Sequence, residues 1–258
     1  MSLIISKQEG AVFKIKLNRP DKFNSFNREM ALQMQEALDK AAGDKTVRAI
    51  YITSEGKAFC AGQDLGEAMD PNGPGLEKIV FEHYNPIIKK IRLIEKPVVC
   101  AVNGVAAGAG ANIALACDIV IAAASASFMQ AFVKIGLIPD SGGTFFLPRL
   151  IGFQRASALM MLGEKISSND ALQMGMIYKV FDDDKLQTEA MSLAKTLSEM
   201  PTKGIGLTKR LLNDSMFNSL EKQLDNEGKL QVEAANSFDY NEGVKAFLEK
   251  RKPVFKGE

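Results

Sequence analysis

The stretch KIGLIPDSGG, residues 134–143, places a single carboxylate, Asp140, among apolar residues and glycines. Its apolar neighbours Ile138, Pro139 and Phe145 would desolvate the carboxylate and raise its pKa, which makes a better general base near neutral pH. An aspartate just before a glycine pair can instead serve as the N-cap of a helix starting near Gly142. The sequence therefore offers two readings of Asp140, proton transfer and helix capping.

Two glycine-rich turns are the other candidates for chemistry. Residues 59–65 (FCAGQDL) and 103–110 (NGVAAGAG) each follow a predicted buried strand. Small residues let the backbone approach a ligand closely, and a helix that begins in such a turn has unpaired N–H groups. If both turns pointed N–H groups at one carbonyl oxygen, they would form an oxyanion hole, where each donor contributes roughly 3–4 kcal/mol.

Other common catalytic motifs are absent from the sequence. It has no GxSxG elbow, no GxxxxGK[ST] loop, no HExxH and no CxxC pair. The single histidine, His83, lies in a charged helical stretch and is predicted to be solvated. We therefore expect no metal site, no cofactor and no imidazole chemistry.

Composition excludes several classes of partner. The net charge is +1, with 32 Lys and Arg against 31 Asp and Glu, so no bulk field attracts nucleic acid or a membrane surface. The uncharged segment 97–117 is interrupted by Asn103-Gly104, which argues against a membrane span. The three cysteines of the chain have no CxxC spacing, which indicates reduced thiols in the core. A cytoplasmic location is therefore expected.

The hydrophobic period alternates between that of strands and that of helices. Strands are predicted at 13–17, 47–53, 97–102, 119–122 and 177–181. Helices are predicted after an Asn27 N-cap and at 76–94, 108–117, 154–162, 168–174, 184–199, 202–233 with interruptions, and 240–250. Strands that alternate with helices favour an α/β fold with parallel strands, followed by a helical C-terminal region.

These motifs, in this order, resemble the crotonase (enoyl-CoA hydratase/isomerase) superfamily over essentially the whole chain. The stretches that carry the resemblance are NRPDKFNSFN, FCAGQDL, YNP, AVNGVAAGAGA, IGLIPDSGGTFFLPRLIG and GVKAFLEKRKPVFKGE. The resemblance implies one domain, residues 1–258: a spiral core of ββα repeats (about 1–195) and a helical C-terminal extension (about 196–258). It also implies a homo-oligomer, a trimer or a dimer of trimers packed through that extension.

The resemblance further implies an acyl-CoA thioester substrate. Its carbonyl would be held by the backbone N–H groups of Ala61 and Ala109. The substrate would run past a surface formed by Phe23, Lys22, Gly62, Gln63, Asp64, Leu65, Gly108, Gly110, Asn112 and Phe132. Asp64 has a competing role as a helix cap or as a brace of its turn.

The departures from the family pattern concern the reaction. Hydratases of the family orient water with two glutamates, at positions that here hold Asn112 and Phe132. Neither residue can act as base or acid, whereas Asp140 stands where similar isomerases carry their acid. The sequence therefore predicts an acyl-CoA isomerase that shifts a proton and double bond, or converts an epoxide to an oxepin.

Three alternatives remain open at the level of the sequence. One is an enoyl-CoA hydratase, and another is an enzyme in which Asp140 is the nucleophile. The third belongs to a different class: an oligomer that binds CoA esters without turnover. An idle buried acid would cost stability, which argues against the third.

Overall fold

The computed structural model describes residues 2–258 and contains a six-stranded sheet at its centre. Its order is β1-β2-β3-β5-β7-β10; β1 pairs with β2 antiparallel, and the other neighbours are parallel. The strands are β1 (Ile4–Glu9), β2 (Val12–Leu17), β3 (Ala49–Ser54), β5 (Val98–Val102), β7 (Ile119–Ala123) and β10 (Lys179–Phe181).

A second sheet of four short strands stands beside the first and carries the predicted turns. Its order is β4-β6-β8-β9, with β4, β6 and β8 parallel and β9 antiparallel to β8. These strands are β4 (Ala58–Cys60), β6 (Val105–Ala107), β8 (Ser127–Met129) and β9 (Lys165–Ser167). The pairs β3/β4, β5/β6 and β7/β8 each place their first strand in the large sheet and their second in the small one, which makes the ββα spiral.

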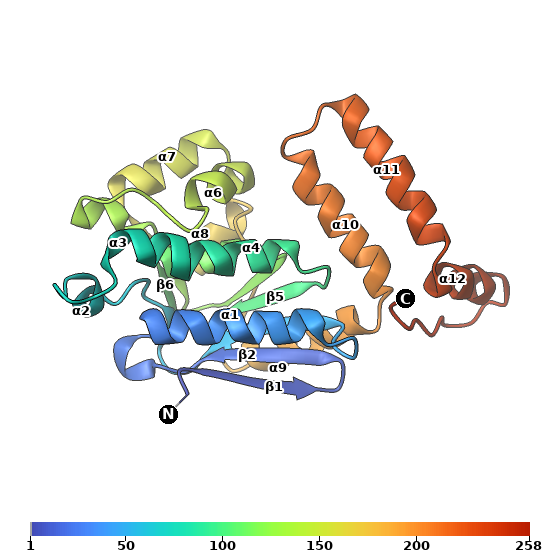
Figure 1. Cartoon of the computed structure of the whole chain (residues 1–258), viewed down its shortest axis with the longest axis horizontal. Helices are drawn as coiled ribbons and strands as arrows, with labels where there is room; N and C mark the ends of the chain where they lie inside the picture. The colour runs from blue at the N-terminus through green and yellow to red at the C-terminus, as the bar shows by residue number, and fades with distance from the viewer. Residues whose placement is uncertain (1) are drawn as a thin grey trace.

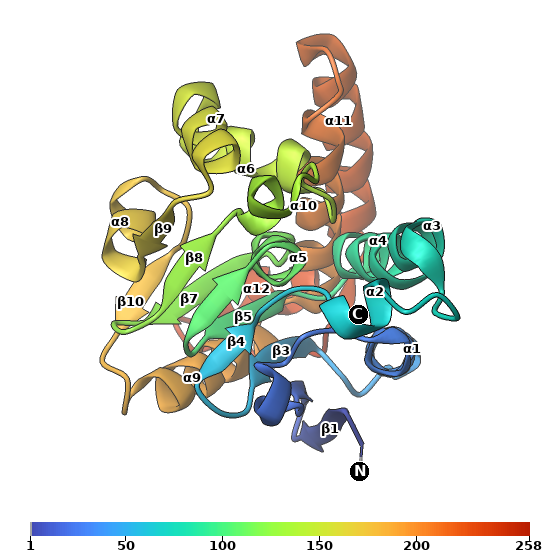
Figure 2. The same cartoon turned by 90° about the vertical axis from the view of Figure 1, so that its left-hand side faces the viewer.

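Helices cover the sheets on both sides (Figures 1 and 2). Helices α1 and α4 pack against each other, and α9 lies against β3, β5 and β7. The helices of this part are α1 (Arg28–Gly43), α2 (Leu65–Ala68), α3 (Gly75–Lys78), α4 (Asn85–Leu93), α5 (Ala109–Leu115), α6 (Gly143–Ile151), α7 (Phe153–Leu162), α8 (Ser168–Gln173) and α9 (Leu186–Ser198), with 3-10 turns η1 (Pro20–Lys22) and η3 (Ala131–Ile135). Because both faces are covered, β3 and β5 are buried along their whole length and read as continuous rather than alternating apolar strands.

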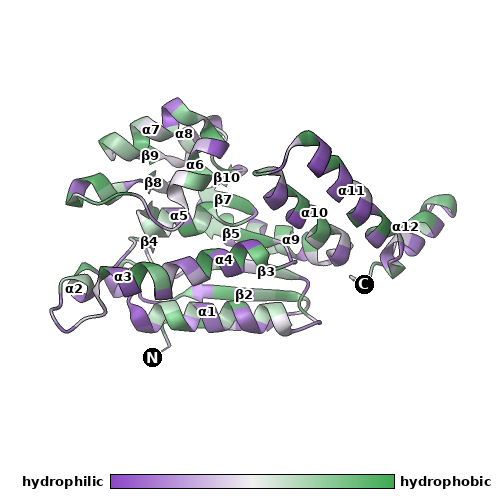
Figure 3. Ribbon diagram, turned by 45° about the horizontal axis from the view of Figure 1, so that its top comes forward, coloured by the Kyte–Doolittle hydropathy of each residue, from purple (hydrophilic) through white to green (hydrophobic). Residues whose placement is uncertain are grey.

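The C-terminal region consists of α10 (Thr202–Ser215), α11 (Leu220–Ala235) and α12 (Phe238–Leu248). Helices α11 and α12 extend away from the sheets on one side of the molecule (Figure 1), and α11 has no buried residue. Figure 3 shows hydrophobic residues along α12 although much of this helix faces outward. Helix α10 is joined to the core by Lys209, whose ammonium donates to the Asp118 carboxylate at 2.7 Å and to the Ile91 carbonyl at 2.7 Å.

Most predicted elements are present, with boundaries that differ by a few residues. Asn27 caps α1 as predicted, since its side chain accepts from the Met30 N–H. The predicted 202–233 segment divides into α10 and α11. The sequence did not predict several elements as separate units: strand β1, the three-residue strands of the small sheet, and helix α6. Short strands carry too few residues for a period to emerge.

The helix predicted at 76–94 contains a π-helical segment, η2 (Ile79–Tyr84), between α3 and α4. Pro86 has no N–H to donate, and the Glu82 carbonyl accepts instead from the Gln35 amide at 2.7 Å. The prediction of a solvated His83 is wrong. Its side chain is fully buried beside the Arg28 guanidinium at 3.2 Å, and burial lowers its pKa.

The cysteine prediction is confirmed: Cys60, Cys100 and Cys117 are all free and buried. Within residues 2–258, the helices are too short or too polar to cross a bilayer.

The Lys209–Asp118 pair generates a stability prediction. Replacing Asp118 with Ala leaves an ammonium group that is 6% exposed without its carboxylate, so we expect a loss of about 3–5 kcal/mol in the free energy of unfolding. Urea denaturation measures it. The exposed pair Lys185–Asp182 is the matched control: Asp182→Ala changes the same quantity by less than about 1 kcal/mol. Equal effects of the two substitutions would contradict the assigned role of Asp118.

Candidate active site

The two glycine-rich turns meet because the strands before them are neighbours. Strands β4 and β6 are parallel, so the chain leaves both at the same edge of the small sheet. A Cβ atom on Gly110 would lie 2.4 Å from the Cys60 carbonyl oxygen, and one on Gly62 would lie 3.1 Å from the Ala107 carbonyl oxygen. Gly62 also has a φ of +94°. The close approach of the turns therefore depends on the missing side chains.

The hydrogen bonds of the first turn correct one predicted donor. The Ala61 N–H donates to the Phe23 carbonyl at 3.0 Å, so it is already satisfied inside the protein. Around Gln63, the Phe26 N–H donates to the Gly62 carbonyl and the Asp64 N–H donates to the Phe26 carbonyl. Within residues 2–258 the Gln63 N–H itself has no acceptor, so it replaces Ala61 as the candidate donor from this turn.

The second predicted donor, Ala109, fits the geometry. Ala109 is the first residue of α5, and its N–H has no acceptor in the part of the chain that the structure describes. The Ala109 nitrogen lies 3.5 Å from the point where a Cβ on Gly62 would stand. An N–H from each turn is thus available at the place where the turns converge.

A cavity of about 220 Å³ opens at this place. Its wall combines predicted residues with others that the motifs did not indicate: Ala61, Gly62, Gln63, Leu65, Ala68, Leu76, Ile79, Gly108, Ala109, Ala131, Phe132, Lys134, Ile135, Leu137 and Asp140. The wall is mainly apolar, and among the residues described Asp140 is its only carboxylate. The wall residues that the motifs did not indicate come mostly from α2, α3 and η3. The sequence shows that these segments carry apolar residues, but it does not show that those residues face the cavity.

Asp140 lines the cavity wall, and its surroundings change the basicity of its carboxylate. Burial raises the pKa of this carboxyl, and a 2.9 Å hydrogen bond donated by the Ser141 hydroxyl opposes the rise. Ser141 has φ +51° and is itself buried, so the backbone here is in the left-handed region. The N-cap of α6 is Gly142, with no side-chain cap bond. The capping alternative therefore does not account for the carboxylate.

Five predicted substrate-binding residues lie outside the wall of this cavity: Lys22, Phe23, Asp64, Gly110 and Asn112. Lys22 is exposed, and Phe23 is 56% exposed on the loop that receives the Ala61 N–H. Asp64 caps α2 through the Gly66 N–H and pairs with Arg19 at 2.7 Å, as its alternative role predicted. Asn112 lies fully buried behind Asp140, whereas Phe132 does line the cavity.

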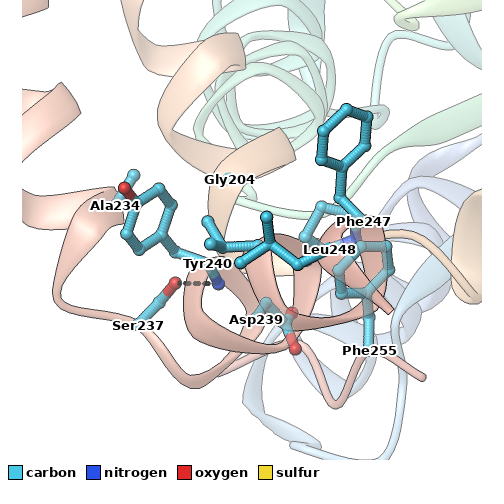
Figure 4. A pocket seen from close by; sticks show the side chains of 11 residues that line it. Gly204, Ala234, Ser237, Asp239, Tyr240, Phe247, Leu248 and Phe255 are labelled. Carbon is cyan, nitrogen blue, oxygen red and sulfur yellow. Dashed lines mark hydrogen bonds between the residues drawn. The ribbon is translucent and has the colours of Figure 1, made fainter. Parts of the chain in front are cut away.

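A larger hollow of about 450 Å³ lies between α10, α11, α12 and the C-terminal tail (Figure 4). Tyr240, Phe247, Leu248 and Phe255 surround it, and its one carboxylate, Asp239, accepts from the Lys256 and Gly257 N–H groups. That carboxylate is fully used in holding the tail. Among the described residues, Tyr240 is the only other titratable side chain that lines this hollow. The 220 Å³ cavity combines the Asp140 carboxylate with the Gln63 and Ala109 N–H groups, so it is the better candidate for catalysis.

Residues 2–258 contain no group of three or more His, Cys, Asp or Glu side chains placed to hold an ion.

Comparison with known proteins agrees with the fold. The family model described as enoyl-CoA hydratase/isomerase matches residues 7–258. The chain is 49% identical to the 1,2-epoxyphenylacetyl-CoA isomerase of Escherichia coli, over 100% of both chains. It is 44% identical to the "Probable enoyl-CoA hydratase" of Rhodobacter capsulatus, over 94% of this chain and 93% of that one.

A solved structure gives the same result for the fold. An enoyl-CoA hydratase from Bacillus anthracis superposes with a TM-score of 0.92 at 32% identity, over 99% of this chain and 100% of that chain. The predicted crotonase fold is thereby confirmed.

The partly buried carboxyl of Asp140 generates a prediction about stability and pH. Its pKa is raised in the folded chain, so the wild type loses stability as pH rises from the unfolded aspartate value of about 4 through the folded value. Asp140→Asn removes this cost. We expect the variant to be more stable at pH 7 by about 0.5–2 kcal/mol, with a smaller gain at pH 4.

Urea unfolding at the two pH values measures the difference. The exposed acid Glu77 supplies the control, because Glu77→Gln should change stability little at either pH. A destabilised Asp140→Asn protein at pH 7 would show that the carboxylate is stabilised by its surroundings rather than strained by burial.

Proposed function

Since this chain belongs to the enoyl-CoA hydratase/isomerase family, we propose that it is an isomerase that moves a proton on an enolisable acyl-CoA thioester. The observation that carries the proposal is the cavity wall. Asp140 is the only carboxylate there among the described residues, and it shares the wall with the turns that bear the Gln63 and Ala109 N–H groups.

The proposed reaction begins with the thioester carbonyl accepting hydrogen bonds from the Gln63 and Ala109 N–H groups. Asp140 removes a proton from the acyl chain, and the electron pair of that C–H bond moves toward the thioester oxygen to give a dienolate. The carboxyl then returns the proton to a different carbon. No atom is gained or lost, so one acid–base group is sufficient.

The second carboxylate that hydration requires has no counterpart in the cavity. Phe132 lines the wall and has no acid–base chemistry, and Asn112 is turned to the Asp140 carbonyl at 2.8 Å. Water would therefore have to be oriented and activated by Asp140 alone. This supports isomerisation over hydration, although relatives with both kinds of name share the fold.

The identity of the acyl group is part of the proposal. The largely apolar wall suits an unsaturated or aromatic acyl chain, and the E. coli relative is named as an isomerase of 1,2-epoxyphenylacetyl-CoA. We include conversion of an arene epoxide to its oxepin isomer, which also leaves the composition of the substrate unchanged.

Replacing Asp140 with Asn tests the proposed role. We expect acyl-CoA binding to survive, and exchange of substrate protons with solvent deuterium to fall by about 10²–10⁴-fold, because the amide has no useful basicity. Mass spectrometry of a 3-enoyl-CoA incubated in D₂O measures the exchange, and calorimetric titration measures binding.

A matched carboxylate outside the cavity gives the control. Glu82 is 48% exposed and pairs with Arg28, so Glu82→Gln should leave exchange unchanged. Near-normal exchange in Asp140→Asn would overturn the assignment of the base. A wild type that neither exchanges protons nor moves the double bond of the 3-enoyl-CoA would favour a CoA-ester-binding protein without turnover, and solvent ¹⁸O in the aspartate would favour a nucleophilic role for Asp140.

The hydratase alternative has its own direct test. With crotonyl-CoA we expect the enoyl absorbance to fall very slowly, because Asn112 and Phe132 provide neither base nor acid. A known hydratase assayed in parallel supplies the positive control. Rapid loss of the absorbance would show that the chain is a hydratase.

We further propose that the chain forms a homo-oligomer through its C-terminal helices, as a trimer or a dimer of trimers. Large apolar side chains stand exposed there, including Val232 at 64%, Phe247 at 82% and Leu248 at 74%. Contiguous exposed apolar residues on a helical surface are typical of subunit interfaces. Light scattering of the wild type, compared with Phe247→Asp, tests this: a wild-type monomer would reject it.

A further inference from the structure

We propose that Asn112, oriented by Gln130, is a positioning residue that fixes Asp140 for proton transfer. The inference rests on the proposed function of Asp140 and goes beyond it, since it gives a task to the amide found where hydratases of the family would carry a glutamate. It starts from a chain of hydrogen bonds that leads from the Gln130 side chain to the Asn112 side chain and on to the main chain of Asp140 in the cavity wall.

The contacts are short, buried and continuous. The Gln130 Nε2 donates to the Asn112 Oδ1 at 2.8 Å, and the Asn112 Nδ2 donates to the Asp140 main-chain carbonyl at 2.8 Å. Asn112 is 0% exposed and Gln130 is 4% exposed. Hydrogen bonds between buried polar groups are stronger than the same bonds in water, and an unpaired member would be costly.

The direction of the chain of hydrogen bonds is fixed by chemistry. A main-chain carbonyl can only accept, so Asn112 must present its Nδ2 to Asp140. Its Oδ1 then faces Gln130, which must donate. The Gln130 Oε1 is left buried without a partner within residues 2–258. By donating to the Asn112 Oδ1, Gln130 therefore holds the Asn112 amide in the orientation that the Asp140 carbonyl requires.

The Asn112 amide is closely packed on the side of α6. A Cβ on Gly143 would lie 2.4 Å from the Asn112 Nδ2, so only a glycine fits at the first residue of α6 beside the amide. The Gly143 N–H also donates to the Asp140 carbonyl, at 2.9 Å. That carbonyl thus accepts two hydrogen bonds, one from α6 and one from the Asn112 side chain.

These two hydrogen bonds hold a segment whose backbone has positive φ angles. Ser141, directly after Asp140, is a non-glycine residue at φ +51°, and Gly142 follows at φ +73°. A left-handed non-glycine residue is unfavourable on its own and persists when its surroundings fix it. The Asn112 amide is one of the groups that fix it, which keeps the carboxylate directed at the cavity.

Asn112 also connects the acid to the oxyanion donors. Its main-chain N–H donates to the Gly108 carbonyl at 3.1 Å, and it lies on α5, which begins at Ala109. One residue therefore contacts the turn that supplies an N–H group and the loop that supplies the base. Its loss should disturb the distance between the two groups and lower turnover more than binding.

The main test compares two near-isosteric substitutions. Asn112→Leu removes the amide, and Gln130→Met removes only the donor that orients it. We expect each to lower the rate constant for solvent deuterium exchange, Asn112→Leu by about 10- to 100-fold and Gln130→Met by less, because a small displacement of the base is enough for such losses. Binding of a non-reactive acyl-CoA thioether should change less than about threefold, measured by calorimetry.

The double variant tests whether the two residues act as one unit. If Gln130 acts through Asn112, then Gln130→Met should have little further effect in the Asn112→Leu background. Gln187→Met is the matched control, because Gln187 also bridges two groups, Tyr51 and Thr53, but on the α9 side of the large sheet. It should leave exchange unchanged even where it lowers the melting temperature.

The outcomes separate this inference from the proposed function. Wild-type exchange that disappears in Asp140→Asn but persists in folded Asn112→Leu and Gln130→Met proteins overturns the positioning role and leaves the base assignment intact. Absence of both exchange and a double-bond shift in the wild type overturns both. If Asn112→Leu fails to fold, Gln130→Met decides alone: an unchanged exchange rate rejects the inference, and a lower rate with unchanged thioether binding supports it.

Discussion

The candidate site depends on how closely two backbone turns approach each other. Gly110 lies against the Cys60 carbonyl with no room for a side chain, and Gly62, at φ +94°, lies against the Ala107 carbonyl and the Ala109 nitrogen with little room for one. The parallel pairing of β4 with β6 brings the turns to the same edge, and the missing Cβ atoms let them come together. The direction of the free N–H groups, the position of α5 and the place of the cavity all follow from this contact.

Two partly buried acids show how the same fold treats charge differently. Asp118 accepts from Arg92, Lys209 and the Val98 N–H, so its charge is shared among three donors and it joins α10 to the core. Among residues 2–258, Asp140 accepts from the Ser141 hydroxyl and pairs with no cation, and burial raises its pKa. A fully paired carboxylate is a structural element, whereas an incompletely paired one at a cavity wall retains the basicity that proton transfer needs.

Sequence reasoning identified the parts that have a local signal. Alternation of strands and helices gave the α/β class, the Asn27 cap marked the start of α1, and the apolar surroundings of Asp140 pointed to its raised pKa. It could not choose between the N–H groups of the first turn, because that choice depends on the Phe23 carbonyl, which accepts from Ala61 and leaves Gln63 free. It also could not place His83, since the π-helical turn of η2 shifts which side chains face inward.

The spiral separates the groups that react from the segments that enclose them. The Gln63 and Ala109 N–H groups follow strands of the small sheet. Another part of the cavity wall comes from the long connection between β4 and β5, which includes α2, α3 and η2. Insertions or substitutions in that connection can reshape the cavity while the strands of the sheet keep their register. Proteins with such a scaffold can therefore diverge in substrate selectivity through changes in one segment. The arrangement of the N–H groups at the ends of the small-sheet strands stays the same.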